Sequence, residues 1–196
     1  MVSIRGVEIG RWSDATYFPA EDTCLLLDAL EEGEGSFIDV GTGTGIVGVR
    51  AAMLGYHVVS TDISVECLRA ASLNAGLNGV AVQTVQCSLL AALTGEHDVI
   101  AFNPPYLPHG GLPDRQLTGG EKGHELALML LSQAEGMLGD DGKVMLVLSS
   151  LGGMDELEDR GRSVWSIRKL GERKLAFETI AVVEARLRKG HCRAQA

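Results

Sequence analysis

The chain has 196 residues, of which 45% are hydrophobic and 22% charged, and its formal net charge is −9. This length and composition predict one globular domain over residues 1–196. The excess of acid opposes non-specific binding to nucleic acid, and the chain shows neither a membrane-spanning apolar stretch nor a signal peptide, so we expect a soluble, cytoplasmic protein. The four cysteines have no paired spacing, and we expect no metal site and no disulfide framework.

Strands and helices are predicted to alternate along the first half of the chain. After an irregular or β-like lead up to Ala15, a helix opens at Pro19 and ends at Gly33 and Gly35. Strands are then expected at 37–40, 57–61, 80–87 and 98–102, with helices at 46–54 and 65–77, the second capped by Ser64. Such alternation is typical of a parallel sheet with crossover helices.

The second half is predicted to complete this sheet. A long loop over 103–118 precedes a helix at 123–138, a turn at 139–142 and a strand at 143–149. A polar helix at 154–160 and two strands, at 163–170 and 175–186, follow. A short turn at Gly171-Glu172 would join these two strands as an antiparallel hairpin at a sheet edge.

Three glycines follow the strand at 37–40 in the order Gly41, Gly43, Gly45, and they let the backbone turn sharply and approach a ligand closely. Asp62, at the end of the next strand, is placed to accept hydrogen bonds from a ribose. Asp39 precedes the glycines, where a carboxylate would repel a diphosphate and attract an ammonium or sulfonium group. These residues favour S-adenosylmethionine as the cofactor.

Other interpretations of this segment stay open at the level of sequence. Gly43-x-Gly45-x-x-Gly48 also satisfies the dinucleotide pattern, so an NAD-dependent oxidoreductase is an alternative. The glycines can also be a tight turn without a ligand, and Asp62 can be a helix cap or a surface acid.

Asn103-Pro104-Pro105-Tyr106 follows the apolar strand at 98–102, at a strand end where open α/β sheets bind ligands. An amide nitrogen is a poor nucleophile, because its lone pair is delocalised. If the Asn103 side-chain oxygen and the Pro104 carbonyl each accept one N–H of a substrate NH₂ group, the nitrogen is fixed for attack. Tyr106 offers a flat face for the substrate, and the prolines restrict the backbone. The alternative is that these residues only make a turn.

Together, these residues resemble the class I S-adenosylmethionine-dependent methyltransferases, and more narrowly the archaeal and eukaryotic side of the HemK-related family. The resemblance rests on five motifs: Tyr17-x-Pro19-Ala20-Glu21-Asp22-Thr23, Asp39 to Gly45, Asp62, Asn103 to Tyr106, and Gly119-Gly120-x-x-Gly123-x-Glu125. It implies a Rossmann-like α/β fold with a seven-stranded, mostly parallel sheet, helices on both faces and an antiparallel C-terminal hairpin. It also implies N5-methylation of the Gly-Gly-Gln glutamine in a class 1 translation termination (release) factor.

The resemblance further implies roles for individual residues. Thr23 would lie against the methionine end of the cofactor, with Tyr17 nearby in the same segment, Asp39 near its amino group and Asp62 on the ribose. Asn103 would contact both the methionine and the substrate. Relatives often carry Asp where this chain has Ser88, so Ser88 would contact the adenine in its place, with Leu89 as the apolar neighbour.

The resemblance also implies a partner, and the residues leave competing activities open. Family members of this short type resemble the catalytic half of a heterodimer with a small zinc-binding activator, and we expect one here. N6-methylation of adenine in nucleic acid needs the same Asn-Pro-Pro-Tyr chemistry, but it also requires an extruded base. Methylation of a protein lysine or a small molecule, and a cofactor-binding scaffold without activity, are the remaining alternatives.

Overall fold

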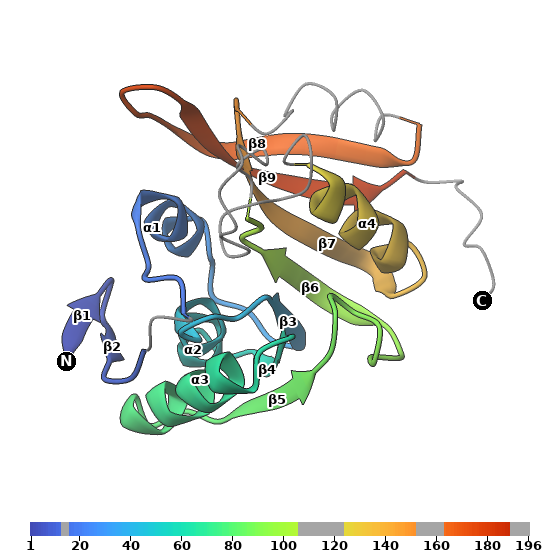
Figure 1. The fold of residues 1–196 in the computed structure, drawn as a ribbon. Helices are drawn as coiled ribbons and strands as arrows, with labels where there is room; N and C mark the ends of the chain where they lie inside the picture. The colour runs from blue at the N-terminus through green and yellow to red at the C-terminus, as the bar shows by residue number, and fades with distance from the viewer. Residues whose placement is uncertain (13–15, 106–123, 152–162, 189–196) are drawn as a thin grey trace.

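A seven-stranded sheet with the strand order β5-β4-β3-β6-β7-β9-β8 runs through the computed structural model (Figure 1). The structure describes residues 1–12, 16–105, 124–151 and 163–188. The strands β3 to β7 pair in parallel, and β9 is antiparallel to both β7 and β8. The predicted mostly parallel sheet with an antiparallel C-terminal hairpin is therefore confirmed. The strands are β3 (Ser36–Val40), β4 (His57–Asp62), β5 (Val82–Gln86), β6 (His97–Phe102), β7 (Leu138–Ser149), β8 (Trp165–Lys174) and β9 (Thr179–Leu187).

Helices cover both faces of this sheet. Residues from α1 (Glu21–Asp28), α2 (Ile46–Met53) and α3 (Val65–Leu77) pack on one face, and those of α4 (Glu125–Ala134) pack on the other. The central strands alternate between two apolar cores: Ile100 faces α4 whereas Val99 and Ala101 face the other side. None of the helices in the described ranges is long and apolar enough to cross a membrane.

The N-terminal lead forms a separate two-stranded hairpin of β1 (Val2–Ile4) and β2 (Val7–Ile9). Val7 and Ile9 are fully buried in the core beside α2. The side chains of Asn74 and Asn78 on and after α3 accept hydrogen bonds from the backbone of this segment at Gly10 and Glu8. The lead is thus packed against the domain by both apolar and polar contacts.

The strand order reverses at β3, which pairs with β4 on one side and with β6 on the other. The segments that follow β3 and β6 therefore run in opposite directions and leave a crevice at the carboxyl ends of these two strands. This is the usual ligand site of open α/β sheets. Val40 and Phe102 are register partners, so the glycine loop and Asn103 both start at this crevice. The fold brings together two motifs that lie about sixty residues apart in sequence.

The turn of the C-terminal hairpin lies four residues beyond the predicted position. Gly171 lies inside β8, and the register shifts between Lys169 and Gly171. The chain reverses at 175–178, where Leu175 N donates to the carbonyl of Glu178. The prediction of a turn at Gly171-Glu172 was wrong because Gly171 lies at a β-bulge within the strand. The actual turn contains none of the residue types that favour turns, so the sequence did not indicate it.

Other boundaries differ from the prediction as well. The helix predicted at 123–138 ends at Ala134, because Leu138 already pairs with β6, and the last strand starts at Thr179 instead of 175. The predicted turn at 139–142 belongs to β7, which starts at Leu138 and carries a bulge between its pairs with His97 and Val99. Helix α1 ends at Asp28, before Gly33 and Gly35. A Cβ at Gly33 would collide with the Tyr56 hydroxyl, and one at Gly35 would lie 2.4 Å from Asp98, so these glycines allow close packing. The helix predicted at 154–160 lies outside the described residues.

Replacing Gly45 with alanine is expected to lower the free energy of unfolding by about 3 kcal/mol. Gly45 has a φ of +84°, and an added Cβ would lie 2.5 Å from the Cα of Ala71 on α3. Gly43→Ala is the matched control, because its φ of +54° carries the backbone penalty but its nearest atom would be 3.9 Å away. Urea denaturation of both variants measures the difference, and equal losses would contradict the packing role of Gly45.

Candidate active site

A pocket of about 500 Å³ lies at the carboxyl ends of β3 and β6. Of the predicted site residues, Gly45 does not line this pocket, because it packs against Ala71 behind the loop. Tyr106 lies outside the described residues. The remaining predicted residues all line the pocket: Tyr17, Thr23, Asp39, Gly41, Gly43, Asp62, Ser88, Leu89, Asn103, Pro104 and Pro105.

The Asp62 carboxylate ties the glycine loop to the start of α3. Gly43 N donates to Asp62 Oδ2 at 3.1 Å, and Ser64 N donates to Asp62 Oδ1 at 2.9 Å. The positive φ angles of Gly41 and Gly43 turn the loop around this carboxylate. Asp62 is half-buried and lines the pocket, so it both shapes the loop and remains available to a ligand.

Asp39 is a buried carboxylate held from behind the loop. Its Oδ2 accepts hydrogen bonds from Thr42 Oγ1 at 2.5 Å and from Gly48 N at 3.0 Å. Burial raises the pKa of Asp39 to about 6, and these hydrogen bonds partly oppose the rise. A Cβ at Gly48 would lie 3.0 Å from this oxygen. The third glycine of the Gly43-x-Gly45-x-x-Gly48 pattern therefore leaves space for the Asp39 carboxylate. A carboxylate in this position disfavours a diphosphate.

The charges around the pocket have one sign. Its charged lining residues in the described part of the chain are four carboxylates, with no Lys, Arg or His among them: Asp22, Asp39, Asp62 and Glu178. Such a lining attracts a cationic ligand and repels phosphate groups.

The Asn103 side chain is oriented by the first turn of α1. Asn103 Nδ2 donates to Asp22 Oδ2 at 3.1 Å and to Thr23 Oγ1 at 3.2 Å. A carboxylate only accepts hydrogen bonds, so the amide nitrogen of Asn103 must face Asp22 and its oxygen must face the other way. That oxygen, Oδ1, is buried and has no hydrogen-bond partner among the described residues. A buried acceptor without a partner is costly, and here it is available to a ligand N–H.

Asp22 lines the pocket and contacts Asn103, and it was not among the site residues predicted from the sequence. It is 3% exposed and accepts hydrogen bonds from Tyr17 Oη at 3.1 Å and from Thr23 N at 2.6 Å, as well as from Asn103. Burial and the neighbouring Asp22 raise the pKa of Tyr17 above its ordinary value. The place of Asp22 directly before Thr23 in the motif Tyr17-x-Pro19-Ala20-Glu21-Asp22-Thr23 was an available signal, but no role was assigned to it from the sequence.

Ser88 and Leu89 form another wall of the pocket, after β5. Leu89 is buried with a φ of +51°, a conformation that is costly for a residue with a side chain. Its carbonyl accepts hydrogen bonds from Thr61 Oγ1 at 3.0 Å and from Cys87 Sγ at 3.4 Å, which hold the turn. Ser88 is exposed and lines the pocket beside it.

Glu178 reaches the pocket from the turn between β8 and β9, and nothing in the sequence indicated this. The Ser149 hydroxyl at the end of β7 donates a hydrogen bond to Glu178 Oε2. Glu178 also contributes to the raised pKa of Tyr17, after burial and Asp22. It lines the pocket together with Tyr17 and Asp22.

Comparison with known proteins agrees with this geometry. Residues 20–169 match the family model described as the methyltransferase small domain. The chain belongs to this methyltransferase family. Its fold is also that of the Mtq2-Trm112 complex of E. cuniculi, described as responsible for methylation of the eRF1 translation termination factor. That likeness has a TM-score of 0.72 and 26% identity, and covers 89% of this chain and 99% of the other.

Two relatives extend the comparison. The chain is 30% identical over 196 residues to a putative protein N5-glutamine methyltransferase of Methanocaldococcus jannaschii, covering 94% of this chain and 98% of the relative. It is 40% identical over 144 residues to the release factor glutamine methyltransferase of Deinococcus radiodurans, covering 65% of this chain and 52% of the relative. The chain thus spans about half the length of that bacterial relative.

S-adenosylmethionine is the cofactor of this methyltransferase, as the sequence predicted. The pocket fits it on two independent observations. Its charged lining among the described residues is acidic and suits a sulfonium and an ammonium group, and its glycine loop presents bare backbone. The NAD-dependent alternative is not supported, because no described cation of the pocket would meet a diphosphate.

Proposed function

We propose that this methyltransferase modifies the side-chain amide nitrogen of a glutamine in a polypeptide, specifically the Gly-Gly-Gln glutamine of a class 1 translation termination factor. The observation that carries the proposal is the Asn103 clamp. The side-chain nitrogen of Asn103 is fixed by Asp22 and Thr23, and its side-chain oxygen is buried with no hydrogen-bond partner among the described residues. The relative from Methanocaldococcus jannaschii and the Mtq2-Trm112 complex support the same substrate class.

The clamp addresses the weak nucleophilicity of an amide nitrogen. Asn103 Oδ1 accepts one N–H of the substrate NH₂ group, and the Pro104 carbonyl accepts the other. The nitrogen is held in one orientation, and positioning of this kind supplies several kcal/mol of a barrier. Bound in the pocket, S-adenosylmethionine supplies an electrophilic methyl group. Tyr106 would pack on the planar amide, and the proton leaves after transfer, when the nitrogen is acidic.

The other pocket residues are proposed to hold the cofactor. Thr23 and Tyr17 contact its methionine end, where Asp39 attracts the ammonium group. Asp62 accepts hydrogen bonds from the ribose, and Ser88 contacts the adenine beside Leu89. Each of these side chains lines the same pocket, which supports the assignment.

The pH dependence of cofactor binding is expected to depend on Asp39. Its pKa is raised from 3.8 to about 6. Folding therefore favours the protonated carboxyl, and the contribution of this group to the stability of the free protein is fully present below about pH 4 and is lost as the pH rises through about 6. A bound ammonium group favours the ionised form, so binding at pH 5.5 should release a proton and affinity should fall below about pH 6. Calorimetry in buffers of different ionisation enthalpy measures that proton, and Asp39→Asn should abolish it. An unchanged proton count in the variant would contradict the assignment.

Methylation of the proposed substrate is tested with labelled S-adenosylmethionine and a class 1 termination factor. Label should appear on the wild-type factor and be absent from a factor in which the Gly-Gly-Gln glutamine is replaced by alanine. Equal labelling of both would refute the target residue. Duplex and single-stranded DNA in parallel reactions test N6-adenine methylation, and a lysine-rich histone tests lysine methylation.

We also propose that the chain works in the cytoplasm as the catalytic subunit of a heterodimer with a small zinc-binding activator. The Mtq2-Trm112 complex supports this assembly, because the likeness covers 99% of the matched chain of that complex. A purified chain that is monomeric, fully soluble and fully active alone would contradict the proposal.

A further inference from the structure

Three Phe and Trp side chains of this chain are exposed, and two of them are next in the chain to residues that line the pocket. Of the 2 Trp and 4 Phe residues, Phe37, Phe102 and Trp165 are buried. The exposed ones are Trp12, Phe18 and Phe177, with exposed fractions of 42%, 41% and 91%. We refer to these three residues as the aromatic rim.

Phe177 and Phe18 are adjacent in the sequence to residues that line the pocket. Phe177 precedes Glu178, and Phe18 stands between Tyr17 and Pro19. Tyr17 and Glu178 both line the pocket, and the Arg173–Glu21 ion pair joins the hairpin to the first turn of α1, which follows Phe18 in the chain. Trp12 packs edge-on against Phe18, with ring centroids 5.4 Å apart.

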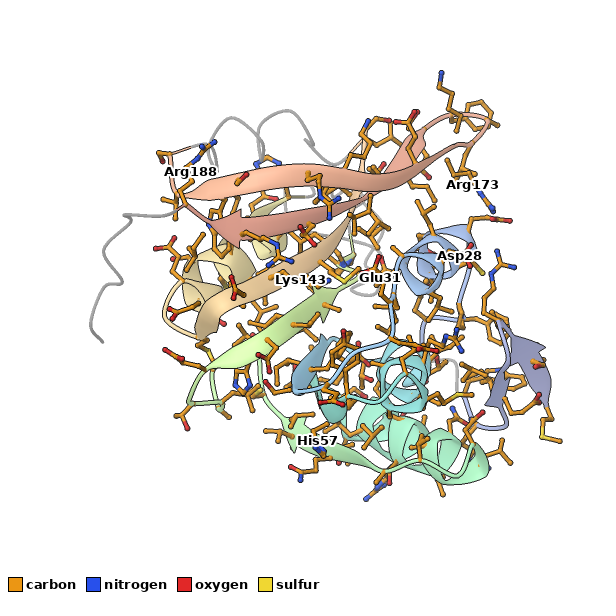
Figure 2. The ribbon with its side chains drawn as sticks, turned by 180° about the vertical axis from the view of Figure 1, so that it is seen from behind. Asp28, Glu31, His57, Lys143, Arg173 and Arg188 are labelled. Atoms are coloured by element: carbon orange, nitrogen blue, oxygen red, sulfur yellow. The ribbon has the colours of Figure 1, made fainter. Side chains whose placement is uncertain are left out.

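The hairpin turn is held in place next to α1. The turn between β8 and β9 extends beyond the neighbouring strands on the side of α1 (Figure 1). Arg173 reaches from β8 toward α1 and forms an ion pair with Glu21 (Figure 2). The Ser149 hydroxyl holds the Glu178 side chain, and Ser150 Oγ accepts from Thr179 N at 3.0 Å. Phe177 is thus presented by a supported turn.

Turn chemistry does not explain Phe177. The turn reads Leu175-Ala176-Phe177-Glu178 and contains no Gly, Pro, Asn or Asp, the residues that usually form turns. A large ring left in water at such a position gains nothing from folding, whereas aromatic rings are frequent anchors of protein interfaces.

We propose that the aromatic rim is the docking surface for the polypeptide substrate, with Phe177 anchoring an apolar side chain of the substrate near the methylated glutamine. The inference rests on the proposed function and adds to it the residues that select a protein. The four carboxylates of the pocket lining favour a polypeptide over a nucleic acid strand as the occupant, because a phosphate backbone entering past Glu178 would be repelled.

The test compares Phe177→Ala with Met53→Ala in the full chain, purified with its activator subunit if it requires one. Met53 is an exposed apolar residue, at 41%, at the end of α2 that points away from the pocket, and it does not line the pocket. Phe177→Ala should raise KM for the termination factor about tenfold or more, which is the size expected for an interface anchor, and leave kcat within about twofold. Met53→Ala should leave both constants unchanged.

Two further measurements separate docking from a folding defect and from the proposed function. The Kd for S-adenosylmethionine should be the same in Phe177→Ala as in the wild type, and the Kd for a termination factor with the target glutamine replaced by alanine should rise in parallel with KM. An unchanged KM in Phe177→Ala would overturn the proposal that the aromatic rim docks the substrate. Methylation of the termination factor by the wild type would in that case still support the proposed function. A wild-type chain that methylates DNA but no termination factor overturns both, and the polypeptide is then the wrong occupant.

Discussion

Replacing Asn103 with alanine is expected to lower kcat for methyl transfer about 10²–10³-fold, the loss typical when one pre-oriented polar group at the reacting atoms is removed. The substitution deletes the side-chain oxygen Oδ1 of Asn103, the proposed acceptor for the substrate N–H. This oxygen is buried without a hydrogen-bond partner in the described structure, and it faces away from Asp22. Single-turnover transfer to the termination factor, measured at saturating cofactor, isolates this step from binding.

Asn78→Ala provides the matched control for Asn103→Ala. Asn78 is another carboxamide with several hydrogen bonds, but it lies at the end of α3 and bonds to the backbone at Glu8. Its loss should lower the free energy of unfolding by about 1–3 kcal/mol, because buried polar groups lose partners, and leave the transfer rate of the folded enzyme unchanged. Transfer by Asn103→Ala at near wild-type rate would contradict the clamp.

Asp22→Asn is expected to lower kcat about 10–100-fold, which corresponds to about 1.4–2.7 kcal/mol. Asp22 is a positioning residue, because its carboxylate requires the Asn103 amide nitrogen to face it. An amide at position 22 can offer its own N–H, and Asn103 can then turn its nitrogen toward the pocket, where it cannot accept an N–H from the substrate.

Tyr17→Phe separates orientation from a general loss of hydrogen bonds. It removes the Tyr17 hydroxyl bonds to Asp22 but keeps both bonds of Asn103. Its effect on kcat should therefore be several times smaller than that of Asp22→Asn, while both variants keep similar unfolding midpoints in urea. Equal effects on kcat would show that Asp22 does not act through Asn103.

Much of the fold could be predicted because local and tertiary preferences agree. The strand β3 ends at Val40, and the helix α3 spans Val65–Leu77 with Ser64 accepting a hydrogen bond from Cys67 N, as the residue pattern indicated. Apolar runs between glycines specify such elements without help from distant residues. The parallel pairing of β3 to β7 followed from the alternation of strands and helices, whereas the order of the strands is known only from the structure.

The differences arise where distant contacts decide. Gly171 reads as a turn residue, but pairing of β8 with β9 continues to Lys174 and leaves the glycine within the strand. Gly33 reads as a helix stop, but its missing side chain makes room for Tyr56. Glu178 and Asp22 are ordinary acids in the sequence, and only the folded chain brings them to the pocket. The side chains of these two acids are positioned by hydrogen bonds to residues 29 and 81 positions away in the sequence.

The dependence of Asn103 on Asp22 couples two segments of the chain over evolutionary time. An amide at position 22 would let the Asn103 side chain, 81 positions later, turn its nitrogen toward the pocket without any change in the Asn-Pro-Pro-Tyr motif. Homologues that keep this motif but carry an amide at position 22 are therefore expected to be slower enzymes, and compensating changes at both positions should appear together in lineages that retain fast methylation.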